Sequence, residues 1–562
     1  MMLRPAHTSL MGPAMDRALL LEQLREDLGF RRIKQGIGRL EQLRPAIETM
    51  EPVPGAGVLA GLVAQWVDAG FDGPALLPRI LERFPAAIRP TLPVVDYLHL
   101  RMVEGVVAMA EEDYTRASAH FLLVQSFDGE IDDRELLAIA NFWIGRCRRK
   151  TGQYDAALDY TERAENLAVQ LGYLPMAAIM QATMSWLAFQ RGKLDDAVAI
   201  LLRAEEALNR TDDFLHRGNI QSAYGRIYRR QGKYERAVQY FERAIEEYRR
   251  AGGEPLQLAR ALQNLAFVRR LLALEAHKEL DRLAASRRGG REGAPDRPDL
   301  AREHRLGIDA MRARSRDHLQ EAMEIYVHRG NHRGMAGVHI NRGFLYLDAG
   351  DLERAALEAA EAFTHGKEKS DHIVMARART LQSIGENAAI EEQVGDASLH
   401  REAAESFARD AVANAGRTQN RRLLARAYVW LGISCSAAPA HDLAEARRCY
   451  EEAMTLLQPE ASGRQYVWDD LETLRARVVQ TWPLDPLLRA WSSGVVEDKS
   501  FQQMTEEFAR IVIPKVWERE GRKVSRVAEK LSISPKKVRR ILQLAGVGNT
   551  KLLTRSPFHP TL

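Results

Sequence analysis

The sequence has few cysteines and no long hydrophobic run, and these absences exclude several classes of protein. Its only cysteines, Cys147, Cys435 and Cys449, are too few and too widely spaced for a disulfide framework or a thiolate metal site. We therefore expect a reducing, cytoplasmic location. No stretch approaches the roughly 18 apolar residues of a membrane-spanning helix, and the first residues contain no signal-peptide core. No membrane association is predicted.

Motifs for catalysis and for metal binding are also lacking. There is no GxxxxGK(S/T) phosphate-binding loop, because the sequence GKEKS at 366–370 has no glycine five residues upstream. His328 and His332 are four residues apart, but Gly330 interrupts the helix between them and no acidic residue accompanies them. We interpret both as surface or inter-repeat histidines. The sequence thus predicts no enzyme, no catalytic residue, no bound metal and no cofactor.

The composition indicates a folded protein with an uneven distribution of charge. Hydrophobic residues make up 46% and charged residues 28% of the chain, a composition typical of globular proteins. With 562 residues, the chain is long enough for several domains or a repeat array. Residues 501–562 contain 13 lysines and arginines but five glutamates, a net charge of +8, so the remainder carries −4. Such a basic end indicates contact with nucleic acid, the alternative being a solvated basic surface.

A forty-residue repeat organises the middle of the chain. Three columns of residues recur at this spacing. The first holds small residues, the second tyrosine or leucine, and the third alanine: Gly105, Gly145, Ser185 and Gly225; Tyr114, Tyr154, Leu194 and Tyr234; Ala117, Ala157, Ala197 and Ala237. The small residues allow two helices to cross closely. Gly152, Gly192 and Gly232 stand where the first helix of each pair must end, and the second column begins the second helix. The pattern predicts stacked antiparallel helix pairs.

These columns resemble the tetratricopeptide repeat family in a form with long helices. The resemblance covers about residues 95–480 and matches the family's small and aromatic positions at Gly145, Tyr154, Ala157 and Ala164, and again at Gly225, Tyr234, Ala237 and Ala244. It implies an all-α fold, a right-handed superhelical solenoid of about eight repeats. In such a solenoid the first helices line the concave face.

The same reading divides the chain into five parts. We expect an N-terminal helical region of degenerate repeats at 1–92, the solenoid at 93–482, a linker at 483–500, a basic domain at 501–550 and a flexible tail at 551–562. A charged segment at about 275–315 interrupts the fifth repeat, and its Gly/Pro/Arg-rich centre at 288–298 predicts two prolonged helices joined by a mobile tip. The insertion is either tolerated or a regulatory, partner-binding loop.

Three helices are predicted in the basic domain. The first, about 502–519, has apolar residues at helical spacing (Phe508, Ile511, Val512, Val516, Trp517), and Pro514 should kink it or mark its weaker half. The second covers about 525–531 and is followed by a turn at 532–534. The third begins with Ser534 as N-cap and Pro535 as its first residue, and its inner face carries Val538, Ile541, Leu542 and Ala545.

Residues 505–547 resemble the Fis-type helix-turn-helix of bacterial enhancer-binding regulators. The resemblance lies in Gly521, Val524-Ser525, Ala528, Leu531, Ile533-Ser534, Val538, Arg540, Ile541 and Gly546, whereas Ser532 replaces the usual glycine and Pro535-Lys536-Lys537 is unusually basic. It implies double-stranded DNA as partner, contacted by Ser525, Ser534, Lys536, Lys537, Arg539, Arg540 and Gln543. The alternative is a structural three-helix cap. The resemblance does not imply ATP hydrolysis for this chain, since the sequence contains no ATPase motif.

Basic residues also recur on the predicted first helices of the solenoid. A groove for an acidic peptide or another anionic ligand would be lined by Arg146, Arg149, Arg226, Arg229 and Arg270. The alternative is that these arginines form salt bridges with glutamates of the second helices. Taken together, the sequence predicts a cytoplasmic bacterial transcription regulator, a homodimer that binds DNA and a protein or peptide; the alternative is a scaffold or adaptor that binds only proteins.

Overall fold

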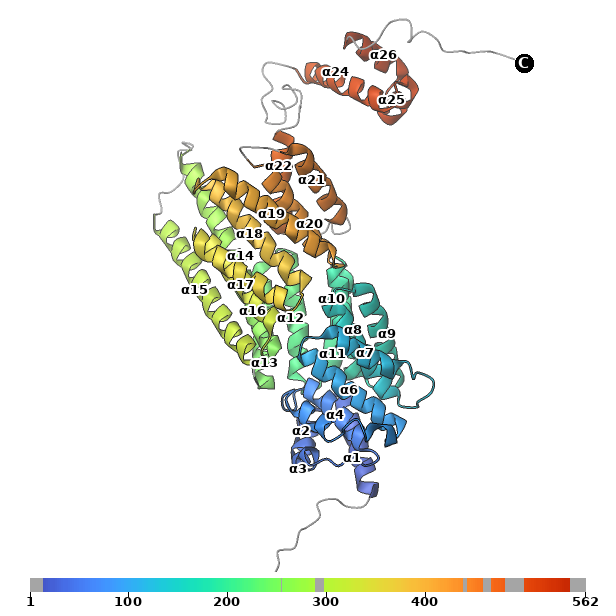
Figure 1. Cartoon of the computed structure of the whole chain (residues 1–562). Helices are drawn as coiled ribbons and strands as arrows, with labels where there is room; N and C mark the ends of the chain where they lie inside the picture. Colours follow the sequence, from blue (N-terminus) through green and yellow to red (C-terminus); the bar gives the residue numbers. More distant parts are fainter. Residues whose placement is uncertain are drawn as a thin grey trace, which may run out of the picture. The chain divides into compact units, whose positions relative to one another are not determined.

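The computed structural model describes residues 14–253, 255–288, 298–437, 442–457, 466–480 and 500–545. Contacts divide the chain into two units, Met1–Arg475 and Ala476–Leu562, and each is considered by itself. Helices are the regular elements throughout the described residues, and the β-pairing there is one isolated bridge between Asp128 and Ile131 (Figure 1). The all-α solenoid predicted from the repeat is confirmed. Among the described helices, none has both the length and the apolar character needed to cross a bilayer.

The N-terminal region consists of short helices around a buried tryptophan. They are α1 (Ala14–Gly29), α2 (Ile33–Gln42), α3 (Arg44–Glu48), α4 (Ala56–Asp68), α5 (Leu76–Glu82) and the 3₁₀ turn η1 (Arg89–Thr91). Trp66 of α4 is fully buried, and a Cβ at Gly36 of α2 would lie 2.0 Å from its ring. Glycine at 36 therefore lets α2 approach α4 closely.

The four gap-free repeats form four antiparallel helix pairs. They are α6 (Val94–Ala110) with α7 (Tyr114–Gln125), α8 (Arg134–Lys150) with α9 (Tyr154–Gln170), α10 (Leu174–Gln190) with α11 (Leu194–Leu208), and α12 (Phe214–Arg230) with α13 (Tyr234–Ala251). Each second helix begins at the predicted column residue. The turns before them contain glycines with φ between +72° and +82°, and Glu112 adopts the same left-handed conformation in the first repeat.

Small residues allow close helix contact inside these pairs, as the spacing predicts. An added Cβ at Gly105 would lie 2.1 Å from the Phe121 ring, and one at Gly145 would lie 2.5 Å from the Thr161 hydroxyl. Ser185 occupies the same column, and its hydroxyl donates a hydrogen bond of 2.9 Å to the Ala197 carbonyl. Larger side chains at these positions would separate the two helices of a pair.

The charged insertion extends one helix pair. α14 (Leu256–Arg288) and α15 (Pro298–His328) run side by side and are the longest helices of the solenoid (Figure 1). The predicted prolongation of both helices is confirmed, while most of the tip at 288–298 lies outside the described residues. Ser315 of α15 is buried and donates a hydrogen bond to the Ala266 carbonyl of α14. The two helices are thus joined by a polar contact as well as by packing.

Seven further helices continue the solenoid. They are α16 (His332–Leu347), α17 (Leu352–Glu368), α18 (His372–Glu391), α19 (Ala397–Gly416), α20 (Arg421–Cys435), α21 (Leu443–Leu457) and α22 (Tyr466–Gln480). Alanines such as Ala359, Ala408 and Ala453 are buried where successive helices cross. Leu471 and Leu474 of α22 are fully buried, as expected of a helix that covers the end of the core.

The C-terminal unit contains three helices around a small core. α24 (Phe501–Arg519), α25 (Val524–Lys530) and α26 (Pro535–Leu544) bury Ile513, Val527, Ala528, Val538, Ile541 and Leu542. Phe508, part of the expected apolar pattern of the first helix, is instead 49% exposed; Ala509 packs on the core in its place. α24 continues through Pro514. The predicted linker before Ser500 and the predicted tail lie outside the described residues.

Candidate functional site

Segments far apart in the sequence meet within the solenoid unit and enclose its interior. The Asn331 amide donates to a carboxylate oxygen of Glu112 at 2.8 Å, and the Arg333 guanidinium donates to the Lys150 carbonyl at 3.3 Å. The Tyr154 backbone N–H donates to the Gln419 side chain at 2.7 Å. The turns before α7 and α9 therefore contact the starts of α16 and α20, which closes the superhelix on itself; we call these contacts the seam.

A second set of contacts joins the N-terminal helices to the start of α12. The buried Arg31 guanidinium pairs with Asp213 at 2.7 Å, and the carboxylate of Asp212 accepts hydrogen bonds from the backbone N–H groups of Ile33 and Lys34. Arg31 and His216 hold the pKa of the Asp213 carboxyl below its usual range despite burial, which by itself would raise it. These bonds fix the N-terminal region against the solenoid.

The enclosed interior contains a cavity of about 370 Å³ lined mainly by first helices of the repeats. Six lysine and arginine side chains line it from α8, α12, α14 and α16: Arg146, Arg149, Lys150, Arg226, Arg260 and Arg333. Tyr154, Trp186 and Tyr248 supply aromatic surface to the same walls. We call this cavity the cationic chamber.

Two of the six cations have a carboxylate partner. Arg146 donates to Asp68 of α4 at 2.5 Å, and Arg333 makes a bidentate pair with Asp371 at 2.5 and 3.0 Å. Each pair raises the pKa of its arginine, although burial alone would lower it. These two cations are therefore neutralised within the protein.

The other four cations form no ion pair with any described carboxylate. Arg149 lies over the Trp186 ring at 5.0 Å, and Arg226 donates only to the Ser222 hydroxyl at 3.1 Å. Burial and the neighbouring arginines lower the pKa of Arg149 to about 9 and that of Arg226 to about 10. Burial, with Arg260 and Arg333 nearby, also lowers the pKa of Lys150 well below its ordinary value.

This arrangement is suited to binding an anion. Like charges in a partly desolvated cavity repel one another, so these four cations destabilise one another. A carboxylate or phosphate placed among Arg149, Lys150, Arg226 and Arg260 would relieve that repulsion through charge-assisted hydrogen bonds. The tryptophan and tyrosines offer apolar contact beside the charge. The chamber can therefore take one compact anionic group together with an attached apolar part.

Three of the five arginines predicted for a groove line this chamber, and two do not. Arg146, Arg149 and Arg226 face the cavity. Arg229 instead donates to Asn264 at 2.8 Å, and Arg270 makes a bidentate pair with Asp348 at 2.5 and 2.7 Å. The salt bridges of Arg146 and Arg270 use aspartates at helix ends, not glutamates of the second helices.

Three chamber cations were missed by the sequence reasoning. Lys150 ends a first helix one residue beyond Arg149, and Arg260 and Arg333 belong to later repeats. Of these three, only Lys150 could have been found from neighbouring residues, because it belongs to the same basic run as Arg146 and Arg149. Arg333 reaches the chamber only because the seam brings α16 against α8, a contact across more than 180 residues.

The second candidate surface is the outer face of α26. Lys536, Lys537, Arg539, Arg540 and Gln543 are all exposed, while Val538, Ile541 and Leu542 on the opposite face are buried. The predicted N-cap is confirmed, since the Ser534 hydroxyl accepts a hydrogen bond from the Lys537 N–H at 3.2 Å. Ser525 on α25 is also exposed. Arg540 pairs with Glu506 of α24 at 3.1 Å.

Comparison with known proteins supports the solenoid. Residues 216–280 match the tetratricopeptide repeat family. No curated protein sequence matches the chain. Similar solved structures include a Rap protein complexed with Competence and Sporulation Factor (12% identity, 72% of this chain and 100% of that one, TM-score 0.47). Human IFIT1 with a capped RNA is 15% identical over 80% of this chain and 96% of that one, with a TM-score of 0.38.

A third similar structure is the tetratricopeptide-sensor STAND protein PH0952 of Pyrococcus horikoshii. It is 14% identical over 87% of this chain and 68% of that one, with a TM-score of 0.38. The match of residues 216–280 to the tetratricopeptide repeat family agrees with the stacked helix pairs and with the repeat spacing.

Proposed function

We propose that the chain is a DNA-binding transcription regulator, without catalytic activity, in which the solenoid binds a protein or peptide and the C-terminal unit contacts duplex DNA. The observation that carries the proposal is the division of α26 into two faces. One face is buried against α24 and α25, and the other presents four exposed cations and a glutamine. A helix of this kind can reach phosphates and base edges in the major groove.

The connection between α25 and α26 supports a helix-turn-helix. Ser532 adopts a left-handed conformation with φ of +50°, at the position where the resemblance expects glycine. Ile533 packs against the core between the two helices, and Ala528 is buried where they meet. The turn is thus short and filled, which fixes the angle at which α26 would be presented to DNA.

The proposed solenoid partner is an acidic peptide or protein segment. Protein interaction is what tetratricopeptide-like solenoids offer by their extended inner surface. The four unpaired cations of the chamber select for an acidic group, and the aromatic walls select for a neighbouring apolar side chain. Binding there would add contacts across the seam, because Arg333 and Lys150 belong to both the seam and the chamber.

The proposal includes a homodimer, because one short helix makes too few phosphate contacts for useful affinity. α24 offers a surface for it: Phe501 is 81% exposed and Phe508 49% exposed, and residues seven apart lie on the same side of a helix. Sedimentation of the full chain and of Phe508→Glu would test this part, with a dimer expected only for the unsubstituted chain.

Electrophoretic mobility shift with the full chain tests the DNA contact. We expect K536E/K537E to lower the affinity for duplex DNA about 100-fold or more, since two phosphate contacts become repulsive. These lysines are chosen because neither pairs with a described carboxylate, so the substitution removes no internal contact. K537E/R540E should act similarly, although it also separates Arg540 from Glu506.

K515E/R519E on α24 is the matched control, because it changes the net charge equally at exposed positions on a different helix. It should retain most of the affinity. Equal losses in both double variants would indicate attraction by net charge rather than by α26. Absence of DNA binding in the unsubstituted chain would favour the adaptor function, in which the C-terminal unit binds protein.

A further inference from the structure

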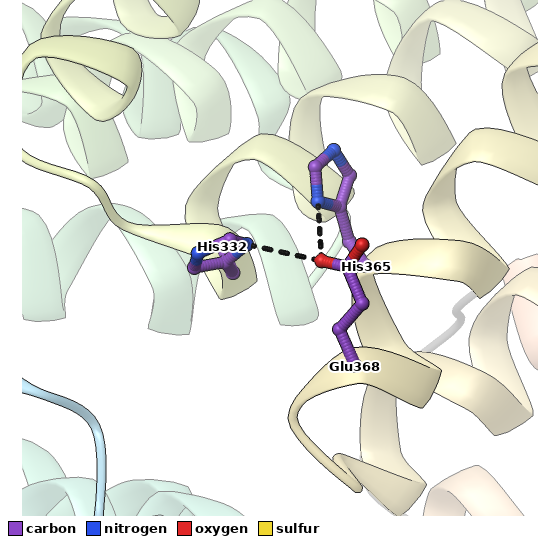
Figure 2. Close-up of side chains that lie close together, drawn as sticks. All are labelled: His332, His365 and Glu368. Atoms are coloured by element: carbon purple, nitrogen blue, oxygen red, sulfur yellow. Dashed lines mark ion pairs between the residues drawn. The ribbon is translucent and has the colours of Figure 1, made fainter.

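A cluster of metal-ligating side chains lies beside the seam and has no role in the proposed function. His332 begins α16, while His365 and Glu368 stand three residues apart at the end of α17. The Nδ1 atoms of His332 and His365 lie 3.5 and 3.9 Å from the same oxygen of Glu368, as Figure 2 shows. One ligand atom from each residue fits within a common separation of 4.8 Å.

We propose that His332, His365 and Glu368 bind a divalent transition metal ion, with Zn²⁺ as the best-suited ion. Two imidazole nitrogens and one carboxylate are a common protein donor set for zinc, with a fourth position left to water or another ligand. Tetrahedral Zn²⁺ at its usual bond lengths needs ligand atoms about 3.3 Å apart. The two separations between an Nδ1 atom and the Glu368 oxygen, 3.5 and 3.9 Å, are close to that value.

The state of the two histidines favours coordination. Their Nδ1 atoms are buried and make no hydrogen bond, which leaves these nitrogens free to act as ligands. His339 lies against the His365 ring, with 5.6 Å between centroids, and is held by Glu358 through a contact of 2.6 Å. The His365 ring is therefore supported from outside the cluster.

The spacing of His328 and His332 in the sequence predicts surface or inter-repeat histidines and no metal ligand. His328 ends α15 on an exposed turn and takes no part in the cluster. The real neighbours of His332 are 33 and 36 residues later. They meet because α16 and α17 form an antiparallel pair, which places the start of the first helix beside the end of the second.

Metal binding at this position would stabilise the seam. His332 stands between Asn331, which donates to Glu112, and Arg333, which donates to the Lys150 carbonyl. An ion that ties His332 to the end of α17 restricts the segment that makes both contacts. The expected consequence is slower opening of the seam, and so of the cationic chamber, when the ion is bound.

The test is Zn²⁺ titration of the full chain, prepared without a polyhistidine tag and freed of metal, by calorimetry or competition with a chromophoric chelator. We expect one high-affinity Zn²⁺ per chain, and an affinity at least about tenfold lower in H332A/H365A. His328→Ala is the matched control and should leave the affinity unchanged. Cobalt(II) bound at the same site should give the visible absorption of a tetrahedral centre, which H332A/H365A should lose.

Unchanged Zn²⁺ affinity in H332A/H365A would overturn the proposal, as would an equal loss in His328→Ala. If the double variant does not fold by circular dichroism, Glu368→Gln, an exposed position, serves instead and should also weaken binding. Hydrogen exchange gives a second readout: Zn²⁺ should protect backbone amides at 111–114 and 150–154 in the unsubstituted chain. Lack of protection there would overturn the link to the seam. None of these results depends on DNA binding.

Discussion

The chamber of the solenoid and the outer face of α26 both collect lysines and arginines, but their surroundings differ. Arg149, Lys150 and Arg226 are confined in a cavity, and burial lowers the pKa of each. Lys536, Lys537 and Arg539 are exposed to solvent. Confined cations gain most from one fitted anion, whereas exposed cations attract any polyanion and are screened by salt. For the same residue types we therefore propose a selective ligand site in one unit and a duplex-binding surface in the other.

The largest expected effect is a difference in the free energy of unfolding between variants of two arginines of the solenoid. Arg270→Met removes the bidentate partner of Asp348, whose side chain is only 8% exposed, and should lower the free energy of unfolding by about 3 kcal/mol. Arg149→Met removes a confined cation without a carboxylate partner, so it should leave stability unchanged or raise it. Urea denaturation of the full chains measures both. Equal losses would contradict the assignment of Arg149 to an unpaired ligand site.

Peptide binding should distinguish the chamber from α26, with a change in affinity of intermediate size. A fluorescein-labelled tetraglutamate peptide should bind the full chain, and R149Q/R226Q should weaken binding about tenfold, since two charge-assisted contacts are lost. The matching tetraglutamine peptide is the control and should not bind detectably. DNA affinity should be the same in R149Q/R226Q as in the unsubstituted chain, because α26 is untouched.

The two regions should also respond differently to pH. Burial lowers the pKa values of Arg149, Lys150 and Arg226 in the chamber, so these three groups hold their charge less strongly than exposed bases do. Affinity for the tetraglutamate peptide should therefore fall as the pH rises above 7 and Lys150, whose pKa burial lowers well below its ordinary value, loses its charge, while affinity for DNA changes little. Without ligand, the folded chain binds fewer protons than the unfolded chain in this range, so these groups make folding more favourable as pH rises. Fluorescence anisotropy at each pH measures both affinities.

The smallest expected effect concerns the turn of the C-terminal unit. Ser532→Gly places the residue that favours left-handed geometry where φ is +50°, and it should stabilise α25 and α26 by up to about 1 kcal/mol. Amide hydrogen exchange in 524–544 would show slower exchange. Ser525→Gly, at the second position of α25, is the control and should speed exchange there, because glycine disfavours a helix.

The sequence predicted the local structure of the solenoid well because each repeat is fixed by neighbouring residues. Tyr114, Tyr154, Leu194 and Tyr234 begin second helices as their spacing requires, and Gly152 is left-handed as a turn glycine should be. The apolar pattern of α24 was less informative. Phe508 has the right spacing for a core residue, yet the small Ala509 takes that place beside α25 and α26.

The sites could be predicted only in part, because the chamber depends on contacts between distant repeats and the histidine cluster depends on the pairing of α16 with α17. Arg146, Arg149 and Arg226 stand on consecutive or near repeats, so periodicity indicated their common face. Arg333 reaches the same chamber through the seam, which no local pattern reveals. His332 likewise lies near His365 because their helices pair, and no sequence spacing indicates this contact.

The most direct test of the account is the salt dependence of DNA binding by the full chain. Four phosphate contacts from Lys536, Lys537, Arg539 and Arg540 in one copy predict that log affinity falls against log salt with a slope of about −3.6, and about twice as steeply for a dimer. The slope should flatten measurably in K536E/K537E. A chain that does not bind duplex DNA at low salt, or whose affinity is indifferent to salt, would contradict the assignment of α26 to DNA.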